Sequence, residues 1–172
     1  SQAAQSDMKV ILADVQEEDL FEVETLLRGE GANAHGIVTD VAVADDVERL
    51  AEETLRRFGA VNLVCNNAGV GLTAPAWSYT SEDWLWVLGV NLFGVINGVR
   101  TFVPIMLDGG EEGHIVNTAS VAGLTSQPGL AAYNVSKHGV VTLSETLYHD
   151  LALKDARIGV SVLCPGSTDT AI

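Results

Sequence analysis

The sequence has 172 residues and a formal net charge of −14, with 9 Lys and Arg against 23 Asp and Glu. Hydrophobic residues make up 47% and charged residues 19%, which is typical of a folded globular domain and excludes a disordered tail. The acidic balance argues against nucleic acid or an anionic membrane as a partner, and we find no apolar run of about 18 residues that would predict a membrane span.

Short apolar runs alternate along the chain with stretches of helical periodicity. We expect strands at residues 9–14, 36–40, 61–65, 114–119 and 158–164, and helices at 17–28, 43–58, 81–107 and 130–153. Strands that are apolar throughout and separated by helices predict a parallel sheet covered on both faces. The length predicts a single domain, at about 100–200 residues per domain. The two cysteines, Cys65 and Cys164, lie in apolar runs and are expected to be buried thiols in a reducing cytoplasm.

Polar and Gly-rich residues follow the expected strands, at Asp14, Asp40, 66–69, 118–120 and 165–170. Each group taken alone is explained by an ordinary turn. Packing does not predict such residues at every strand end, and parallel sheets bind ligands beyond the carboxyl ends of their strands. We therefore expect a ligand site at this edge of the sheet.

Tyr133 and Lys137 are four residues apart on an expected helix, so they share one face of it. A nearby cation favours the phenolate form, which suits a tyrosine that acts as a general acid or base. The alternative is a surface tyrosine with a lysine beside it.

Two further polar residues occupy informative places. Ser120 ends an expected strand, where its hydroxyl could hydrogen-bond a substrate oxygen; alternatively, it is a serine that caps a helix or turn. Asn91 lies in the middle of an apolar helix, where asparagine is unfavourable unless its polar groups are used. It is either a satisfied core residue or the site of a kink that holds a water.

Together these residues resemble the short-chain dehydrogenase/reductase family. The resemblance rests on Asn66-Asn67-Ala68-Gly69, Asn91, Ser120, Tyr133-x-x-x-Lys137 and Pro165-Gly166-x-x-x-Thr170, in family order and spacing over residues 9–172. It implies an α/β fold with a Rossmann-like, doubly wound parallel sheet and helices on both faces. Residues 1–172 would then form a single, incomplete dinucleotide-binding and catalytic domain.

The resemblance implies an oxidoreductase that moves a hydride between NAD(H) and a secondary alcohol or ketone. Tyr133 would be the general acid or base, Lys137 would bind the nicotinamide ribose and favour the phenolate, and Ser120 would polarise the carbonyl. Asn91 would help to hold a water in a proton relay. The implied cofactor-binding residues are Asp14, Asp40, Val41, Asn67, Ala68, Gly69, Tyr133, Lys137, Pro165, Gly166, Thr168 and Thr170. No metal ligands are expected, because the four histidines lack metal-ligand spacing.

Asp14 favours NAD over NADP, because a carboxylate accepts both adenosine ribose hydroxyls and repels a 2′-phosphate. An aspartate that begins the next turn is the alternative. Asp40 and Val41 fit the family's adenine contact, and the alternative for Asp40 is an acid that caps the following helix. Thr168 departs from the family, which has an aliphatic residue there.

The family's opening strand, Gly-rich turn and helix do not occur before Lys9. The first strand is central in a doubly wound sheet, so without it we expect two half-sheets with exposed edges. The Gly-rich turn would also supply the N–H groups that bind phosphate. Our hypothesis is that the chain is part of a longer protein or only its ordered part; at 18.2 kDa we expect weak NAD binding and little activity.

Two alternatives to the dehydrogenase remain open. One is an epimerase or dehydratase that uses the same tyrosine, and the other is a non-catalytic scaffold that has the sheet but no turnover. The family commonly pairs through the helices equivalent to 81–107 and 130–153, which implies a homodimer or homotetramer. A cytoplasmic location and no nucleic-acid or membrane partner are expected.

Overall fold

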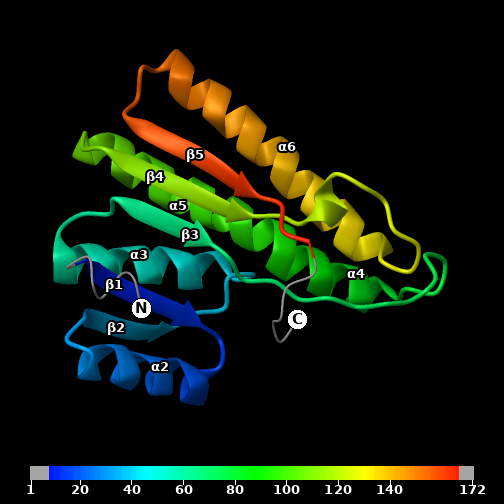
Figure 1. Cartoon of the computed structure of the whole chain (residues 1–172), viewed down its shortest axis with the longest axis horizontal. Helices are drawn as coiled ribbons and strands as arrows, with labels where there is room; N and C mark the ends of the chain where they lie inside the picture. The colour runs from blue at the N-terminus through cyan, green and yellow to red at the C-terminus, as the bar shows by residue number, and fades with distance from the viewer. Residues whose placement is uncertain (1–7, 167–172) are drawn as a thin grey trace.

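The computed structural model describes residues 8–166, so Thr168 and Thr170 lie outside the described residues. Strands and helices alternate along the chain (Figure 1). The strands are β1 (Lys9–Asp14), β2 (Asn33–Val38), β3 (Leu63–Asn66), β4 (Gly113–Thr118) and β5 (Ile158–Leu163). The helices are α2 (Glu17–Gly29), α3 (Ala44–Phe58), α4 (Ser81–Leu88), α5 (Gly94–Gly109) and α6 (Ala131–Leu153), with a π-helical turn η1 (Gly89–Phe93) and a 3-10 turn η2 (Val121–Gly123).

All paired strands are parallel, which confirms the expected α/β class. The described strands form two sheets, β1–β2 and β3–β4–β5. In Figure 1 the strands lie side by side in the order β2, β1, β3, β4, β5, and their arrowheads point the same way. The expected division into two half-sheets is therefore present.

Helix α3 joins the two sheets. Its buried residues Val47, Leu50 and Ala51 form a core cluster with Phe102 of α5. The cluster packs on Ile11 and Ile37 of the two-stranded sheet, on Val64 of β3 and on Val61 just before β3. Apolar side chains at helical spacing on one side of α3 thus hold the half-sheets together. The helix ends at Gly59, whose φ of 80° is the left-handed cap that glycine adopts without strain.

The main core lies between the three-stranded sheet and helices α5 and α6. It is built from Val103, Met106, Ile115, Leu147, Leu151 and Ile158. On the opposite face of this sheet, Leu63 and Leu163 are 43% and 49% exposed and Cys65 is exposed. The expectation that Cys65 is buried was therefore wrong. Burial of a strand residue depends on what packs over it, and no helix of the described residues covers this face.

Strand β2 begins three residues earlier than expected and ends two residues earlier. Ala34 and Gly36 are buried, while Asn33 is exposed and His35 is half-buried. This alternation is the pattern of a strand with one covered face. Its first residues are not continuously apolar, so an apolar run does not identify the start of this strand.

The expected helix at 81–107 is continuous but changes its winding at η1. It begins at a capping box in which Thr80 and Asp83 bond each other's backbone. By length and composition, the 29-residue stretch Ser81–Gly109, whose most apolar 18-residue window has a mean hydropathy of 1.5, could cross a membrane, so excluding a span from the sequence was too strong. In this fold 44% of its most apolar window is buried, and Phe102, Val103 and Met106 pack in the cores described above.

Candidate active site

Tyr133 and Lys137 lie on the same side of α6, near the carboxyl end of β4. The Lys137 side chain is 3% exposed, and its Nζ donates a hydrogen bond of 2.8 Å to the carbonyl oxygen of Thr118, the last residue of β4. Nζ also lies 5.6 Å from the centroid of the Tyr133 ring. The geometry thus places an ammonium beside a half-buried phenol, as their i, i+4 spacing requires.

Burial lowers the pKa of Lys137 to about 8. Moving an ammonium out of water disfavours its charged form, and no carboxylate of the described residues forms an ion pair with it. The group therefore titrates close to neutral pH while keeping its charge at pH 7. Such a cation suits a site where negative charge or hydroxyl groups must be held.

Ser120 precedes η2 at the same strand end. It is 9% exposed, and its Oγ accepts a hydrogen bond of 3.2 Å from the backbone N–H of Ala122. The capping role considered above is therefore present. Because the hydroxyl accepts that bond, it can still donate its proton elsewhere. A Cβ on Gly123 would lie 2.7 Å from the Lys137 carbonyl oxygen, so η2 packs closely on the turn of α6 that carries Lys137.

Asn91 lies inside η1 and is completely buried. Its Oδ1 accepts from the Val70 N–H at 2.8 Å, and its Nδ2 donates to the Val70 carbonyl at 2.9 Å and to Ser136 Oγ at 3.2 Å. The side chain is therefore a satisfied core amide. The winding changes from α-helical to π-helical around this residue, and the expected role of Asn91 in holding a water stays a prediction.

A second buried polar chain joins β3, β4 and α6. Asn66 Nδ2 donates to Asn117 Oδ1 at 2.8 Å, and Asn117 Nδ2 donates to Ser144 Oγ at 2.9 Å. Gly98 of α5 makes room for it, because a Cβ there would lie 2.1 Å from Asn66 Oδ1. Sequence reasoning missed Asn117 and Ser144, although an asparagine inside an apolar strand was the available signal.

The residues that follow β3 and β5 lie at the same edge. Thr118 Oγ1 donates to Asn67 Oδ1 at 2.9 Å, so the chain from Asn67 through Ala68 to Gly69 begins beside β4. After β5, the carbonyl of Pro165 accepts from the Val121 N–H at 2.9 Å, and Gly166 follows it. The structure thus brings these residues close to the carboxyl end of β4, where Lys137 of α6 hydrogen-bonds the Thr118 carbonyl.

Asp14 is the last residue of β1, and Asp40 and Val41 lie in the loop that follows β2. Asp14 is exposed, and its Oδ1 accepts from the Gln16 N–H at 2.9 Å, as an aspartate at a turn does. Asp40 Oδ1 accepts from the Ala42 N–H at 2.9 Å. The carbonyl of Val41 accepts from Asn97 Nδ2 at 2.9 Å, which ties this loop to α5.

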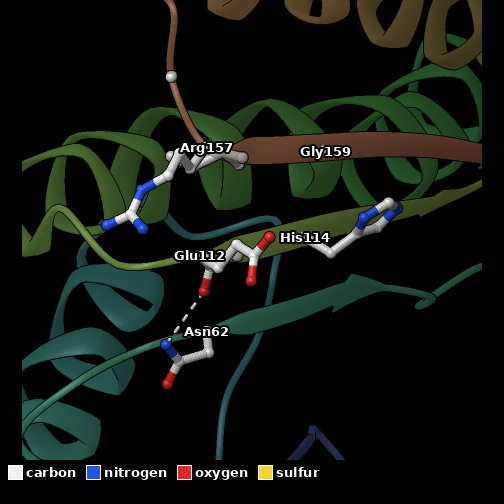
Figure 2. Close-up of a pocket in the computed structure, with 8 residues that line it drawn as sticks. Asn62, Glu112, His114, Arg157 and Gly159 are labelled. Carbon is white, nitrogen blue, oxygen red and sulfur yellow. Dashed lines mark hydrogen bonds between the residues drawn. The ribbon is translucent and has the colours of Figure 1, made fainter.

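An open hollow of about 610 Å³ lies at the other end of the three-stranded sheet, where β4 and β5 begin. Figure 2 shows Asn62, Glu112, His114 and Arg157 around it, with the Asn62 side chain donating to the Glu112 carbonyl. His114 bonds Ser161, and Arg157 donates to the Gly110 carbonyl. The side chains of Asn62, His114 and Arg157 thus have hydrogen-bond partners, and the hollow lies at the opposite end of the sheet from Tyr133, so we do not assign the active site to it. The described residues contain no cluster of three or more side chains suited to a metal ion.

Comparison with known proteins identifies the family and the fold. The sequence profile of the family described as short chain dehydrogenase matches residues 1–172. The chain therefore belongs to the short chain dehydrogenase family. It is 37% identical over 169 residues to a C alpha-dehydrogenase from Sphingobium sp., covering 98% of this chain and 55% of that protein.

Solved structures share the fold. A short chain dehydrogenase/reductase from Burkholderia phymatum in complex with NAD superimposes with a TM-score of 0.95 at 50% identity, covering 96% of this chain and 59% of that one. An alcohol dehydrogenase from Thermococcus sibiricus complexed with 5-hydroxy-NADP has a TM-score of 0.89 at 24% identity, covering 97% and 69%, which shows the fold alone. The chain spans 55% to 61% of the length of the first curated relatives it matches.

Proposed function

We propose that this chain carries the proton-transfer residues of an NAD(H)-dependent oxidoreductase that interconverts a secondary alcohol and a ketone. The observation that carries the proposal is the buried Lys137 ammonium, 5.6 Å from the Tyr133 ring and bonded to the end of β4. The catalytic and cofactor-binding roles of the individual residues stay predictions.

In this proposal Tyr133 gives a proton to the carbonyl oxygen during reduction and takes it back during oxidation. Lys137 stabilises the phenolate that reduction leaves behind, because its charge lies beside the ring. Ser120 donates its hydroxyl hydrogen to the same substrate oxygen and so orients the carbonyl. Asn91 holds η1 against the loop after β3 through its two bonds to Val70, and the water that it would help to retain passes protons toward Lys137.

The residues present fit the ribose parts of a nicotinamide cofactor. A buried ammonium without a carboxylate partner among the described residues suits a ribose diol, and the Asp14 carboxylate at the end of β1 suits the adenosine ribose hydroxyls. Asp40, Val41, Asn67, Ala68, Gly69, Pro165, Gly166, Thr168 and Thr170 would line the remainder. The cofactor, when bound, supplies or accepts the hydride. Asp14 leads us to propose NAD, which the Burkholderia phymatum structure contains.

A thermal-shift titration with NADH and NADPH tests cofactor binding. We expect NADH to raise the melting temperature at lower concentration than NADPH, since ligand that binds only the folded state stabilises it. A stronger effect of NADPH would overturn the choice of NAD. No shift with either nucleotide would favour the scaffold alternative.

A Tyr133→Phe variant tests the proton transfer in a screen of secondary alcohols and ketones. It should keep the NADH-induced shift and lose about 100- to 10,000-fold in turnover. Tyr148→Phe is the matched control, because Tyr148 lies on the same helix and is 56% exposed; its turnover should match the wild type. If Tyr133→Phe retained turnover, this phenol would not be the proton donor. If the wild type formed product without a net change in NADH, an epimerase or dehydratase would be favoured instead.

We also propose a homodimer or homotetramer in the cytoplasm that acts on a small-molecule substrate. Leu85, Trp86 and Phe93 on α4 and η1 are 74%, 48% and 52% exposed, which leaves apolar surface for a second copy. Light scattering of a Leu85→Glu variant tests this, since a charge there should shift the protein toward monomer. An unchanged mass would exclude this surface.

A further inference from the structure

A buried serine connects Asn91 to the helical turn that carries Tyr133 and Lys137. Ser136 is completely buried on α6. Its Oγ accepts the 3.2 Å bond from Asn91 Nδ2 and donates a 2.7 Å bond to the Tyr133 carbonyl. Since the hydroxyl uses both its donor and an acceptor position, its orientation is fixed by two elements at once.

The bonds form a continuous chain across the site. Both backbone groups of Val70, in the loop after β3, bond the Asn91 side chain, which bonds Ser136, which bonds Tyr133. Hydrogen bonds linked in series inside a protein polarise and strengthen one another. The loop after β3, η1 and the first turns of α6 are therefore held in one arrangement.

We propose that Ser136 is a positioning residue for Tyr133 and Lys137, acting through its bonds to Asn91 and to the Tyr133 backbone. It would touch neither substrate nor cofactor. A serine in a helix commonly bonds the carbonyl three or four residues before it, but here the same oxygen also anchors α6 to η1. The catalytic part of this inference rests on the proposed function, whereas the anchoring part does not.

The chain offers a matched control in Ser144. This serine is 2% exposed on the same helix, donates to the Val140 carbonyl at 2.7 Å and accepts from Asn117 Nδ2. Alanine at either position removes the same hydroxyl and leaves a buried amide N–H without that acceptor. Both variants should therefore have a melting temperature a few degrees below the wild type, by a similar amount, because each loses one buried hydrogen bond.

The experiment compares Ser136→Ala and Ser144→Ala in the natural full-length protein. We expect Ser136→Ala to lower kcat about tenfold or more with KM for NADH within about twofold, because small displacements of catalytic groups slow chemistry more than binding. Ser144→Ala should leave kcat and the KM for NADH within about twofold of the wild-type values. Hydrogen-exchange mass spectrometry should show faster amide exchange in η1 and the first turns of α6 for Ser136→Ala only.

The positioning role would be overturned if the two variants lost kcat equally and each loss followed the decrease in that variant's melting temperature. Unchanged exchange in η1 with Ser136→Ala would overturn the anchoring. If the wild type turns over no substrate with NADH or NADPH, the proposed function fails by itself. The exchange comparison still decides the anchoring in that case, since faster exchange confined to Ser136→Ala supports it.

Discussion

Replacing Lys137 by methionine should stabilise the folded chain while removing turnover. The side chain is 3% exposed, and its pKa falls from the ordinary 10.5 to about 8. A pKa difference of about 2.5, at about 1.36 kcal/mol for each pH unit, means that holding the protonated amine in the fold costs about 3 kcal/mol at pH 7. Methionine avoids this cost and loses the bond to Thr118, which contributes about 1 kcal/mol. We expect a net gain of about 2 kcal/mol at pH 7.

This gain depends on pH in a defined direction. Below pH 8 the amine is protonated in both states, so the wild type bears the full cost. Between pH 8 and 10.5 the unfolded chain binds the proton more tightly than the folded chain, so stability rises with pH. The wild type should gain about 2 kcal/mol between pH 7 and about 9.5, whereas the methionine variant lacks this titration. The two proteins should therefore become about equally stable at the higher pH.

Urea unfolding followed by tryptophan fluorescence measures both quantities, and the chain has three tryptophans. Lys154→Met is the control for loss of a lysine from the same helix, since Lys154 is exposed at its C-cap, and its free energy of unfolding at pH 7 should be close to that of the wild type. A Lys137→Met variant less stable than the wild type at pH 7 would refute the argument. So would a stability difference that is the same at both pH values.

Three further substitutions test the packing and the cofactor choice. Gly98→Ala places a Cβ against Asn66 Oδ1 and should cost about 1–3 kcal/mol in urea unfolding, whereas Gly109→Ala, on the same helix with open space around it, should cost nothing. Gly59→Ala forces a side chain into φ 80° and should cost about 1 kcal/mol. Asp14→Ser should lower the ratio of the NADPH dissociation constant to the NADH dissociation constant by about tenfold, as measured by fluorescence titration. An unchanged ratio would mean that Asp14 does not determine the choice of cofactor.

Features that depend on local periodicity were predictable from the sequence. The expected strand at 9–14 matches β1, and the helices at 43–58 and 130–153 match α3 and α6 within one residue. The shared side of Tyr133 and Lys137 follows from helix geometry alone. Each of these depends only on residues close together in the chain.

Features that depend on distant contacts were not predictable. The partners of Asn91 are 21 and 45 residues away at Val70 and Ser136, so only the fold could show that its side-chain amide is satisfied. The exposure of Cys65 depends on what packs over the three-stranded sheet, which its own apolar run does not encode. The Asn66, Asn117 and Ser144 chain likewise joins β3, β4 and α6.

Because α3 bridges the two sheets by side-chain packing, the two parts of the molecule are expected to differ in local stability. The unit of β1, α2 and β2 shares no ladder with β3–β5 in the described residues, so packing on α3 and loop contacts such as that of Val41 with Asn97 secure it. Side-chain packing separates more readily than a paired ladder, and such a unit can open cooperatively below the free energy of global unfolding. Because Asp14 belongs to this unit and Asp40 follows it in the chain, its opening would displace the residues proposed to bind the adenosine part of the cofactor while leaving Tyr133 and Lys137 in place.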